Sequence, residues 1–174
     1  MERMRGGIGR IIVYTGNGQG KTTASLGIAL RSIAHNKKVV VIQFMKGRKD
    51  IGEFLARKFL PNYEIHQFGR EGFVDLSKPS EEDKLLAKKA MSFAIEKLRE
   101  KPYLMILDEI NLAMHIGLIS TKEVLKLIDL KPPETNLILT GRNAGREIIE
   151  RADVVTEMRD IKRTKIEARE GIEY

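Results

Sequence analysis

Short apolar segments alternate along this chain with longer stretches in which apolar and charged residues recur at helical spacing. Most of the short segments are continuously apolar, which is typical of strands that are buried on both faces of a sheet. The strands predicted in this way cover residues 10–15, 38–44, 63–68, 103–108, 136–140 and 153–158. Strands of this kind indicate a sheet that carries helices on both sides.

The stretches between the strands carry helix signals. A first helix is predicted from residue 22 to about residue 35, with Asn36 as its C-cap. Three later helices have a residue of capping type before their first turn. The residues predicted to cap them are Asp50 with Glu53, Ser80, and Ser120 with Glu123. A shorter helix is predicted within residues 144–152.

The alternation of strand and helix predicts a three-layer α/β/α fold with a mostly parallel sheet. No internal repeat, low-complexity segment or proline-rich linker divides the sequence, so we expect a single domain over residues 1–174. Ligands of such sheets bind beyond the carboxyl ends of the strands. Functional residues are therefore expected in the segments that directly follow the predicted strands.

The segment VYTGNGQGKTTAS, residues 13–25, joins the first predicted strand to the first helix. Its glycines allow the backbone to curl, so that consecutive N–H groups face the oxygens of a phosphate. Lys21 places an ammonium on the terminal phosphates, and the Thr22 hydroxyl can ligate Mg²⁺. The usual phosphate-binding loop begins with glycine, whereas this one has Thr15 at that position. The loop predicts a nucleotide site and a P-loop NTPase fold of the RecA-like type.

The segment YLMILDEI is an apolar strand that ends in Asp108 and Glu109. Acidic residues after a strand often do no more than cap the next helix, and Asp108 alone does not distinguish the two roles. In a chain that also carries the glycine loop, they are the expected Mg²⁺ partner of that loop, a Walker-B-type site.

Two further strand ends bring polar residues to the same edge of the sheet. LILTGRNA carries Thr140, Gly141 and Arg142, and the arginine could bind a phosphate in bidentate fashion or lie on a surface turn. VIQFMKG carries Gln43 and Lys46, and a solvated Lys46 is an equally good interpretation. A glycine-flanked loop, GREGFVD, follows the third strand. On spacing alone, its Phe73 is a packing residue rather than a platform for a flat ligand.

The composition narrows the class of protein. With 42% hydrophobic and 32% charged residues and no apolar run of about 20 residues, the chain is expected to be water-soluble and not to span a membrane. It has no cysteine, which excludes disulfides, cysteine-bound zinc and a thiol nucleophile and fits a cytoplasmic protein. The formal net charge of +7 suits an anionic partner such as a polyphosphate, a nucleic acid or an acidic cofactor.

Taken together, these motifs resemble those of one enzyme family. VYTGNGQGKTTAS, VIQFMKG, ILDEIN, LTGRNA, ADVVTEM and the final GIEY, in this order and spacing, are similar to the P-loop ATP:corrinoid adenosyltransferases, also called cob(I)yrinic acid a,c-diamide adenosyltransferases. The resemblance covers about residues 10–174. In that family TGNGxGKT is the usual spelling, so Thr15 is a mark of the family.

The resemblance implies that the Co(I) of a reduced corrinoid attacks the 5′ carbon of ATP and that the whole triphosphate leaves. It implies a nucleotide turned around in the loop, with its γ-phosphate where other P-loop proteins hold the β-phosphate. The implied catalytic residues are Lys21, Thr22 and Glu109, and the implied Mg²⁺ ligands are Thr22, Asp108 and Glu109. The implied ATP-binding residues are Thr15, Gly16, Asn17, Gly18, Gln19, Gly20, Lys21, Thr22, Thr23 and Arg142. Phe73 is the implied contact to the corrinoid.

The resemblance also implies an electron-donating reductase as partner, a homodimer, and neither nucleic acid nor membrane as partner. The sequence departs from the family pattern in three places. Val74 and Asp75 follow Phe73 where the family has a further aromatic residue, and the arm before the first strand is short. The last residues, DIKRTKIEAREGIEY, lack the family's His, Pro and Phe. Two alternatives stay open: a RecA-like ATPase that acts on nucleic acid, and an ATP-binding regulatory protein without corrinoid chemistry.

Overall fold

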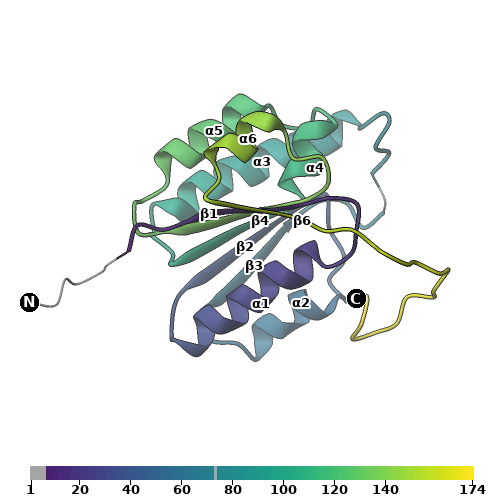
Figure 1. Cartoon of the computed structure of the whole chain (residues 1–174), viewed down its shortest axis with the longest axis horizontal. Helices are drawn as coiled ribbons and strands as arrows, with labels where there is room; N and C mark the ends of the chain where they lie inside the picture. The colour runs from purple at the N-terminus through teal and green to yellow at the C-terminus, as the bar shows by residue number, and fades with distance from the viewer. Residues whose placement is uncertain (1–6, 73) are drawn as a thin grey trace, which may run out of the picture.

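The computed structural model describes residues 7–72 and 74–174. Within them, strands form one six-stranded sheet in the order β3-β2-β4-β5-β1-β6, and every neighbouring pair is parallel (Figure 1). The strands are β1 (Ile11–Thr15), β2 (Val39–Phe44), β3 (Tyr63–Phe68), β4 (Leu104–Asp108), β5 (Asn136–Thr140) and β6 (Val154–Glu157). Each lies inside a segment that the apolar pattern predicted as a strand.

Helices cover both faces of this sheet, which confirms the three-layer α/β/α fold. In Figure 1, α1 and α2 lie on one face, and α3, α4, α5 and α6 lie on the other. The helices are α1 (Lys21–Ala34), α2 (Gly52–Leu55), the 3₁₀ helix η1 (Ala56–Lys58), α3 (Glu81–Leu98), α4 (Ile110–His115), α5 (Thr121–Leu130) and α6 (Arg146–Arg151). None of these described helices is long and apolar enough to cross a lipid bilayer.

The connections explain where a binding crevice opens. From β1 to β3 the chain moves toward one edge of the sheet with α1 and α2 on one face; it then returns through β4, β5 and β6 with α3 to α6 on the other face (Figure 1). The connecting helices change to the other face of the sheet at the point where the strand order reverses its direction. Every crossover between parallel strands therefore keeps the same handedness. The neighbouring strands β1 and β5 are therefore followed by helices on opposite faces. A crevice forms at their carboxyl ends, beyond Thr15 and Thr140.

The buried core consists of two apolar clusters, one on each face of the sheet. Every residue of β2 and β4 is buried, as their continuous apolar sequences predicted. The parallel register places Gln43, near the end of β2, opposite both Asp108 of β4 and Gln67 of β3. Buried polar side chains thus meet at the carboxyl edge of an otherwise apolar sheet.

The helix caps test the sequence predictions locally. Ser120 forms the predicted capping box with Glu123. Ser80, which was predicted only to precede an acidic first turn, also forms a capping box, with Asp83 as its partner. The predicted capping box of Asp50 and Glu53 is wrong. The residue before α2 is Ile51, and the Asp50 carboxylate instead pairs with its exposed neighbour Arg48 at 2.7 Å.

The ends of α1 and α4 also differ from expectation. The C-cap of α1 is His35, and the predicted cap, Asn36, follows it in the left-handed conformation at φ 55°. No helix was predicted at α4, which starts directly after Glu109, itself left-handed at φ 64°. This sharp turn at the end of β4 carries the chain from the strand into a six-residue helix.

The segment after β6 contains no helix or strand and crosses the carboxyl edge of the sheet (Figure 1). It passes the glycine loop and ends beside α1 and α2. There Tyr174 packs against the apolar cluster of that face, and its ring lies 4.9 Å from the guanidinium of Arg48. The end of the chain thereby helps to enclose a cavity next to the glycine loop.

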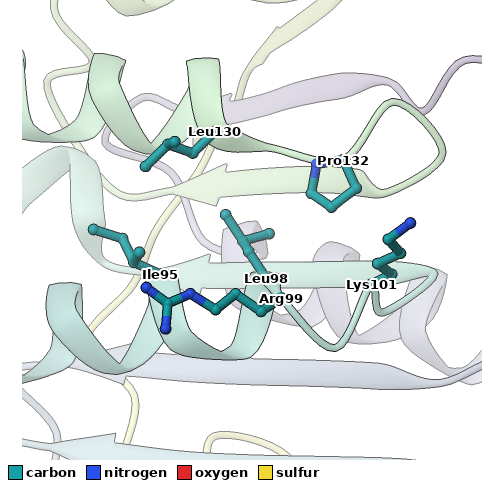
Figure 2. A pocket seen from close by; sticks show the side chains of 6 residues that line it. All are labelled: Ile95, Leu98, Arg99, Lys101, Leu130 and Pro132. Carbon is teal, nitrogen blue, oxygen red and sulfur yellow. The ribbon is translucent and has the colours of Figure 1, made fainter.

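One cavity lies at the opposite edge of the sheet. It holds about 180 Å³ between α3 and α5 (Figure 2). Its lining residues are Ile95, Leu98, Arg99, Lys101, Leu130 and Pro132. Because β4 and β5 begin beside it, this cavity lies away from the strand ends that carry the predicted motifs.

Candidate functional site

The glycine loop between β1 and α1 has the curled backbone that its sequence predicted. Gly16 and Gly20 have φ angles of 93° and 101°, which side-chain-bearing residues rarely adopt. Gly18 is required for a different reason, because a Cβ atom there would lie 2.7 Å from the backbone nitrogen of Arg159. The Gly18 N–H also donates to the carbonyl of Met158 at 2.8 Å. The loop is thus packed against the segment that follows β6.

Lys21 folds back over this loop. Its ammonium donates to the carbonyl oxygens of Gly16 at 2.8 Å and Gly18 at 2.6 Å, and the residue is only 8% exposed. Burial lowers the pKa of Lys21, and the nearby Glu109 carboxylate partly opposes this effect. The ammonium therefore lies inside the curve of the loop.

Asp108, at the end of β4, is fully buried and accepts hydrogen bonds at both carboxylate oxygens. Oδ1 accepts from the hydroxyls of Thr22 at 2.8 Å and Thr140 at 2.7 Å. Oδ2 accepts from the Gln43 amide at 3.0 Å and from the Lys46 ammonium at 2.7 Å. Four donors from β2, α1, β5 and the loop after β2 thus surround one carboxylate, and they satisfy it completely.

The electrostatics of this cluster favour an ion pair. Burial alone raises the pKa of Asp108, but the Lys46 ammonium and the two threonine hydroxyls outweigh it, so the pKa of this carboxyl lies below its usual value. Burial likewise lowers the pKa of Lys46, and the Asp108 carboxylate more than compensates, so the pKa of Lys46 is raised. Both groups are therefore charged at neutral pH.

Glu109 differs from its neighbour. Burial, together with the adjacent Asp108 carboxylate, raises the pKa of Glu109. Among the residues that the structure describes, no group donates a hydrogen bond to its buried Oε2 atom. The backbone N–H of Glu109 donates to the Thr140 hydroxyl at 3.0 Å, which holds the turn against β5. This carboxylate therefore has a buried oxygen without a described partner, whereas both oxygens of Asp108 are engaged.

The loop, Glu109 and Arg142 line one cavity of about 180 Å³. Gly141 makes room for this arrangement: at φ 124° it lies so close to α4 that a Cβ atom would be 2.9 Å from the Leu112 nitrogen. The lining residues are Asn17, Gly18, Gln19, Gly20, Lys21, Thr22, Thr23, Glu109, Arg142 and Arg163. The backbone donors, an ammonium and two guanidinium groups make this cavity suitable for a polyphosphate.

A larger cavity of about 460 Å³ adjoins the first and shares Thr22 and Thr23 with it. It opens between α1 and α2, beyond the end of β2, and the C-terminal Tyr174 closes one side. Most of its wall is apolar, and its charged lining residues are Lys46 and Glu53 near β2 and Glu173 near the end of the chain. Its apolar lining residues are Leu26, Ala29, Leu30, Ile33, Ala56, Leu60, Tyr63 and Ile172.

Comparison with known proteins now decides the family. The model of the family "ATP:corrinoid adenosyltransferase BtuR/CobO/CobP" matches residues 8–174. The chain belongs to the ATP:corrinoid adenosyltransferase family. It is 40% identical to a corrinoid adenosyltransferase of Sinorhizobium sp, over 95% of this chain and 80% of the relative. It is 34% identical to the corrinoid adenosyltransferase of Escherichia coli K12, over 95% of this chain and 86% of the relative.

Family membership confirms the resemblance that the strand-end motifs predicted. The fold brings most of the predicted site residues together around one cavity. Of the predicted ATP-binding residues, Thr15 and Gly16 do not line it: the Thr15 hydroxyl accepts from the Ala144 N–H at 3.1 Å, and the Gly16 carbonyl holds Lys21. Phe73, the predicted corrinoid contact, lies outside the described residues.

The structure also brings to the site residues that were not predicted there from sequence. Gln67 donates to the Gln43 amide oxygen at 3.0 Å and so orients the amide that binds Asp108. Glu53, predicted only as a cap, accepts from the same Gln43 amide at 3.1 Å. Asp160 and Arg163 reach the glycine loop from the segment after β6. The sequence offered one signal for Asp160 and Arg163: they follow a strand of a parallel sheet, and residues in such positions lie at the carboxyl edge with the site.

Proposed function

We propose that this protein transfers the 5′-deoxyadenosyl group of ATP to the Co(I) of a reduced corrinoid and releases inorganic triphosphate. In this reaction the Co(I) electron pair forms the cobalt–carbon bond, the bond between the 5′ carbon and its oxygen breaks, and its electrons leave on the triphosphate. The observation that carries the proposal is the cationic, donor-rich cavity at the glycine loop of a member of this family.

The chain's own residues act on the leaving group. A departing triphosphate gains negative charge, and donors that are already in place stabilise that charge without reorganising. The loop N–H groups and the Lys21 ammonium would bind the phosphate chain from one side, and Arg142 would bind it from the end of β5. No general base is required, because Co(I) is itself the nucleophile. Catalysis would then consist of positioning and electrostatic stabilisation.

The oxygen donors at the site fit Mg²⁺, which keeps several waters and usually takes one or two protein ligands beside substrate phosphates. Thr22 and Glu109 line the cavity, and the Glu109 Oε2 atom has no described hydrogen-bond partner. Asp108 does not line the cavity, and its oxygens are occupied by four donors. We therefore assign Thr22 and Glu109 as ligands and Asp108 as the residue that orients the Thr22 hydroxyl. Bound Mg²⁺ would neutralise charge on the triphosphate.

The larger cavity is the proposed site for the adenosyl end of ATP. It adjoins the triphosphate cavity at Thr22 and Thr23, and its apolar wall suits a flat base and a ribose better than a phosphate. It lies on the side of Lys46 and Glu53, beyond the end of β2. A nucleotide that is turned around in the loop would place its 5′ carbon there, on the side away from the glycines.

Formation of Co(I) requires an electron from a low-potential donor, so a reductase is the expected protein partner. We expect a homodimer built from a single-domain chain, which light scattering after size-exclusion chromatography would test. A cytoplasmic location fits both the ATP substrate and the absence of cysteine from the sequence.

The test is an assay with ATP, Mg²⁺ and chemically reduced corrinoid, in which the phosphate products and the adenosylated corrinoid are measured. Equal amounts of adenosylcorrinoid and inorganic triphosphate are expected. ADP and phosphate as the only products would rule out the proposal. Stimulation of ATP hydrolysis by single-stranded DNA would instead favour the RecA-like ATPase.

A further inference from the structure

The segment after β6 contacts the glycine loop at two successive backbone N–H groups. The Gly18 N–H donates to the Met158 carbonyl at 2.8 Å, and the Gln19 N–H donates to the Asp160 carboxylate at 3.0 Å. The second oxygen of Asp160 accepts from the Arg163 guanidinium at 3.2 Å. The Asp160 carboxylate and the Arg163 guanidinium are thus held together beside Gln19 of the glycine loop.

The donor that Asp160 uses belongs to the proposed triphosphate site. Gln19 lines the cavity, and its N–H is one of the consecutive loop donors that such a site presents to phosphate oxygens. A carboxylate oxygen and a phosphate oxygen are both anionic acceptors, and one N–H cannot serve both at full strength. Asp160 therefore competes with an incoming phosphate for the Gln19 N–H and also repels its charge.

Arg163 has the opposite effect on a phosphate. It lines the same cavity as Lys21 and Arg142. A guanidinium has five N–H donors, and Arg163 uses one of its nitrogens for Asp160. The Arg163 side chain is 53% exposed and that of Asp160 is 26% exposed, so water screens their attraction and the pair is exchanged at little cost.

We propose that Asp160 and Arg163 form an exchangeable pair that controls the binding and release of triphosphate. The inference rests on the proposed function, because it assigns the loop cavity to the triphosphate of ATP. As triphosphate binds, it displaces Asp160 from the Gln19 N–H and takes Arg163 as an additional ligand. When Asp160 returns to Gln19, it favours release of the triphosphate product.

The experiment measures binding of inorganic triphosphate and of Mg·ATP to the full chain by isothermal titration calorimetry, without corrinoid. Arg163→Ala is expected to weaken triphosphate binding about three- to tenfold, a range set by a charge-assisted hydrogen bond at a half-exposed site. Arg163→Lys should recover part of the loss. Asp160→Ala is expected to tighten binding by a similar factor. Lys162→Ala, which removes an exposed charge from the same segment, is the matched control and should bind like the wild type.

Opposite effects of the two variants are the signature of exchange. A pair that only fastens the segment to the loop would give changes in the same direction, because either substitution breaks the same contact. Any outcome other than weaker binding by Arg163→Ala and tighter binding by Asp160→Ala, each relative to Lys162→Ala, overturns the inference. Failure of the proposed function looks different, because then the wild type itself would bind neither triphosphate nor Mg·ATP.

Discussion

The buried cluster around Asp108 can be tested by removing its charge and its acceptors separately. In Asp108→Asn, the new amide can turn its NH₂ group toward the hydroxyls of Thr22 and Thr140, which can both accept a hydrogen bond. Its oxygen then still accepts from Gln43 and Lys46. In this variant the two threonine contacts are kept with their direction reversed, and the main loss is the negative charge. Asp108→Ala removes the charge and leaves all four donors without their acceptor.

The two variants differ in their expected cost. Breaking a fully buried ion pair costs about 3–5 kcal/mol. The Lys46 side chain is 29% exposed, so we expect Asp108→Asn to lower the free energy of unfolding by a smaller amount, about 2–3 kcal/mol. In Asp108→Ala, the buried Gln43 and Thr140 groups also lose a partner, at about 1–3 kcal/mol each. This variant should therefore be less stable than Asp108→Asn by at least about 2 kcal/mol.

Urea-induced unfolding, monitored by circular dichroism, gives these differences when the slope of free energy against urea is unchanged. A double-mutant cycle with Lys46→Met isolates the ion pair from the other contacts. Lys46→Met alone leaves a buried, uncompensated carboxylate, whereas the double variant Lys46→Met with Asp108→Asn leaves none. We expect the double variant to lose about 2 kcal/mol less unfolding free energy than the sum of the losses in the two single variants.

A loss of less than about 1 kcal/mol in Asp108→Asn, or a coupling energy within about 0.5 kcal/mol of zero, would refute this reasoning. The Asp108 carboxylate would then not be committed to Lys46. It would be free to ligate Mg²⁺ directly, and the assignment of Thr22 and Glu109 as ligands would lose its main support.

Three further predictions concern other parts of the molecule. Lys21→Ala should weaken Mg·ATP binding at least tenfold in calorimetry and abolish adenosyl transfer, and wild-type affinity in this variant would count against the loop as the triphosphate site. Leu26→Trp should fill the larger cavity and weaken binding of ATP but not of inorganic triphosphate, whereas equal loss of both would place the adenosyl end elsewhere. Hydrogen bonds from the Arg70 guanidinium hold the pKa of the buried Asp83 at about 2, below its usual 3.8. This stabilisation, about 2 kcal/mol, is present above pH 4 and is lost as the pH falls toward 2. The difference in unfolding free energy between the wild type and Asp83→Asn should therefore shrink between pH 4 and pH 2 and stay constant near neutral pH.

The fold was predictable to a large extent because its signals are local. A strand buried on both faces must be apolar at nearly every position, so β2 and β4 were evident from sequence. The capping box of Ser120 and Glu123 spans three residues of sequence and was predicted in the same way, whereas at Ser80 the helix start was predicted but the box with Asp83 was not. The box predicted at Asp50 failed because α2 starts one residue later, after the buried Ile51, and the Asp50 carboxylate pairs with Arg48 instead.

The gathering of the site residues at one edge was predictable, but their individual surroundings were not. The motifs after β1, β4 and β5 predicted a polyphosphate site, because parallel strands bring their carboxyl ends to one edge. The sequence alone did not distinguish the roles of Asp108 and Glu109, which are neighbours in an acidic pair. The left-handed turn at Glu109 points the two carboxylates into different surroundings. One is surrounded by donors, and the other has an oxygen with no described partner.

The amino-acid sequence by itself determined the layered parallel sheet, the curled glycine loop and the family. Each depends on residue types at fixed spacing, which act through backbone conformation and burial close to the residues that carry them. Only the tertiary structure decided which side chains share the site. Gln67, Asp160 and Arg163 lie far from the glycine loop in sequence. They reach the site because the strand order and the path after β6 place them there, and pairing between distant segments leaves no local pattern to read.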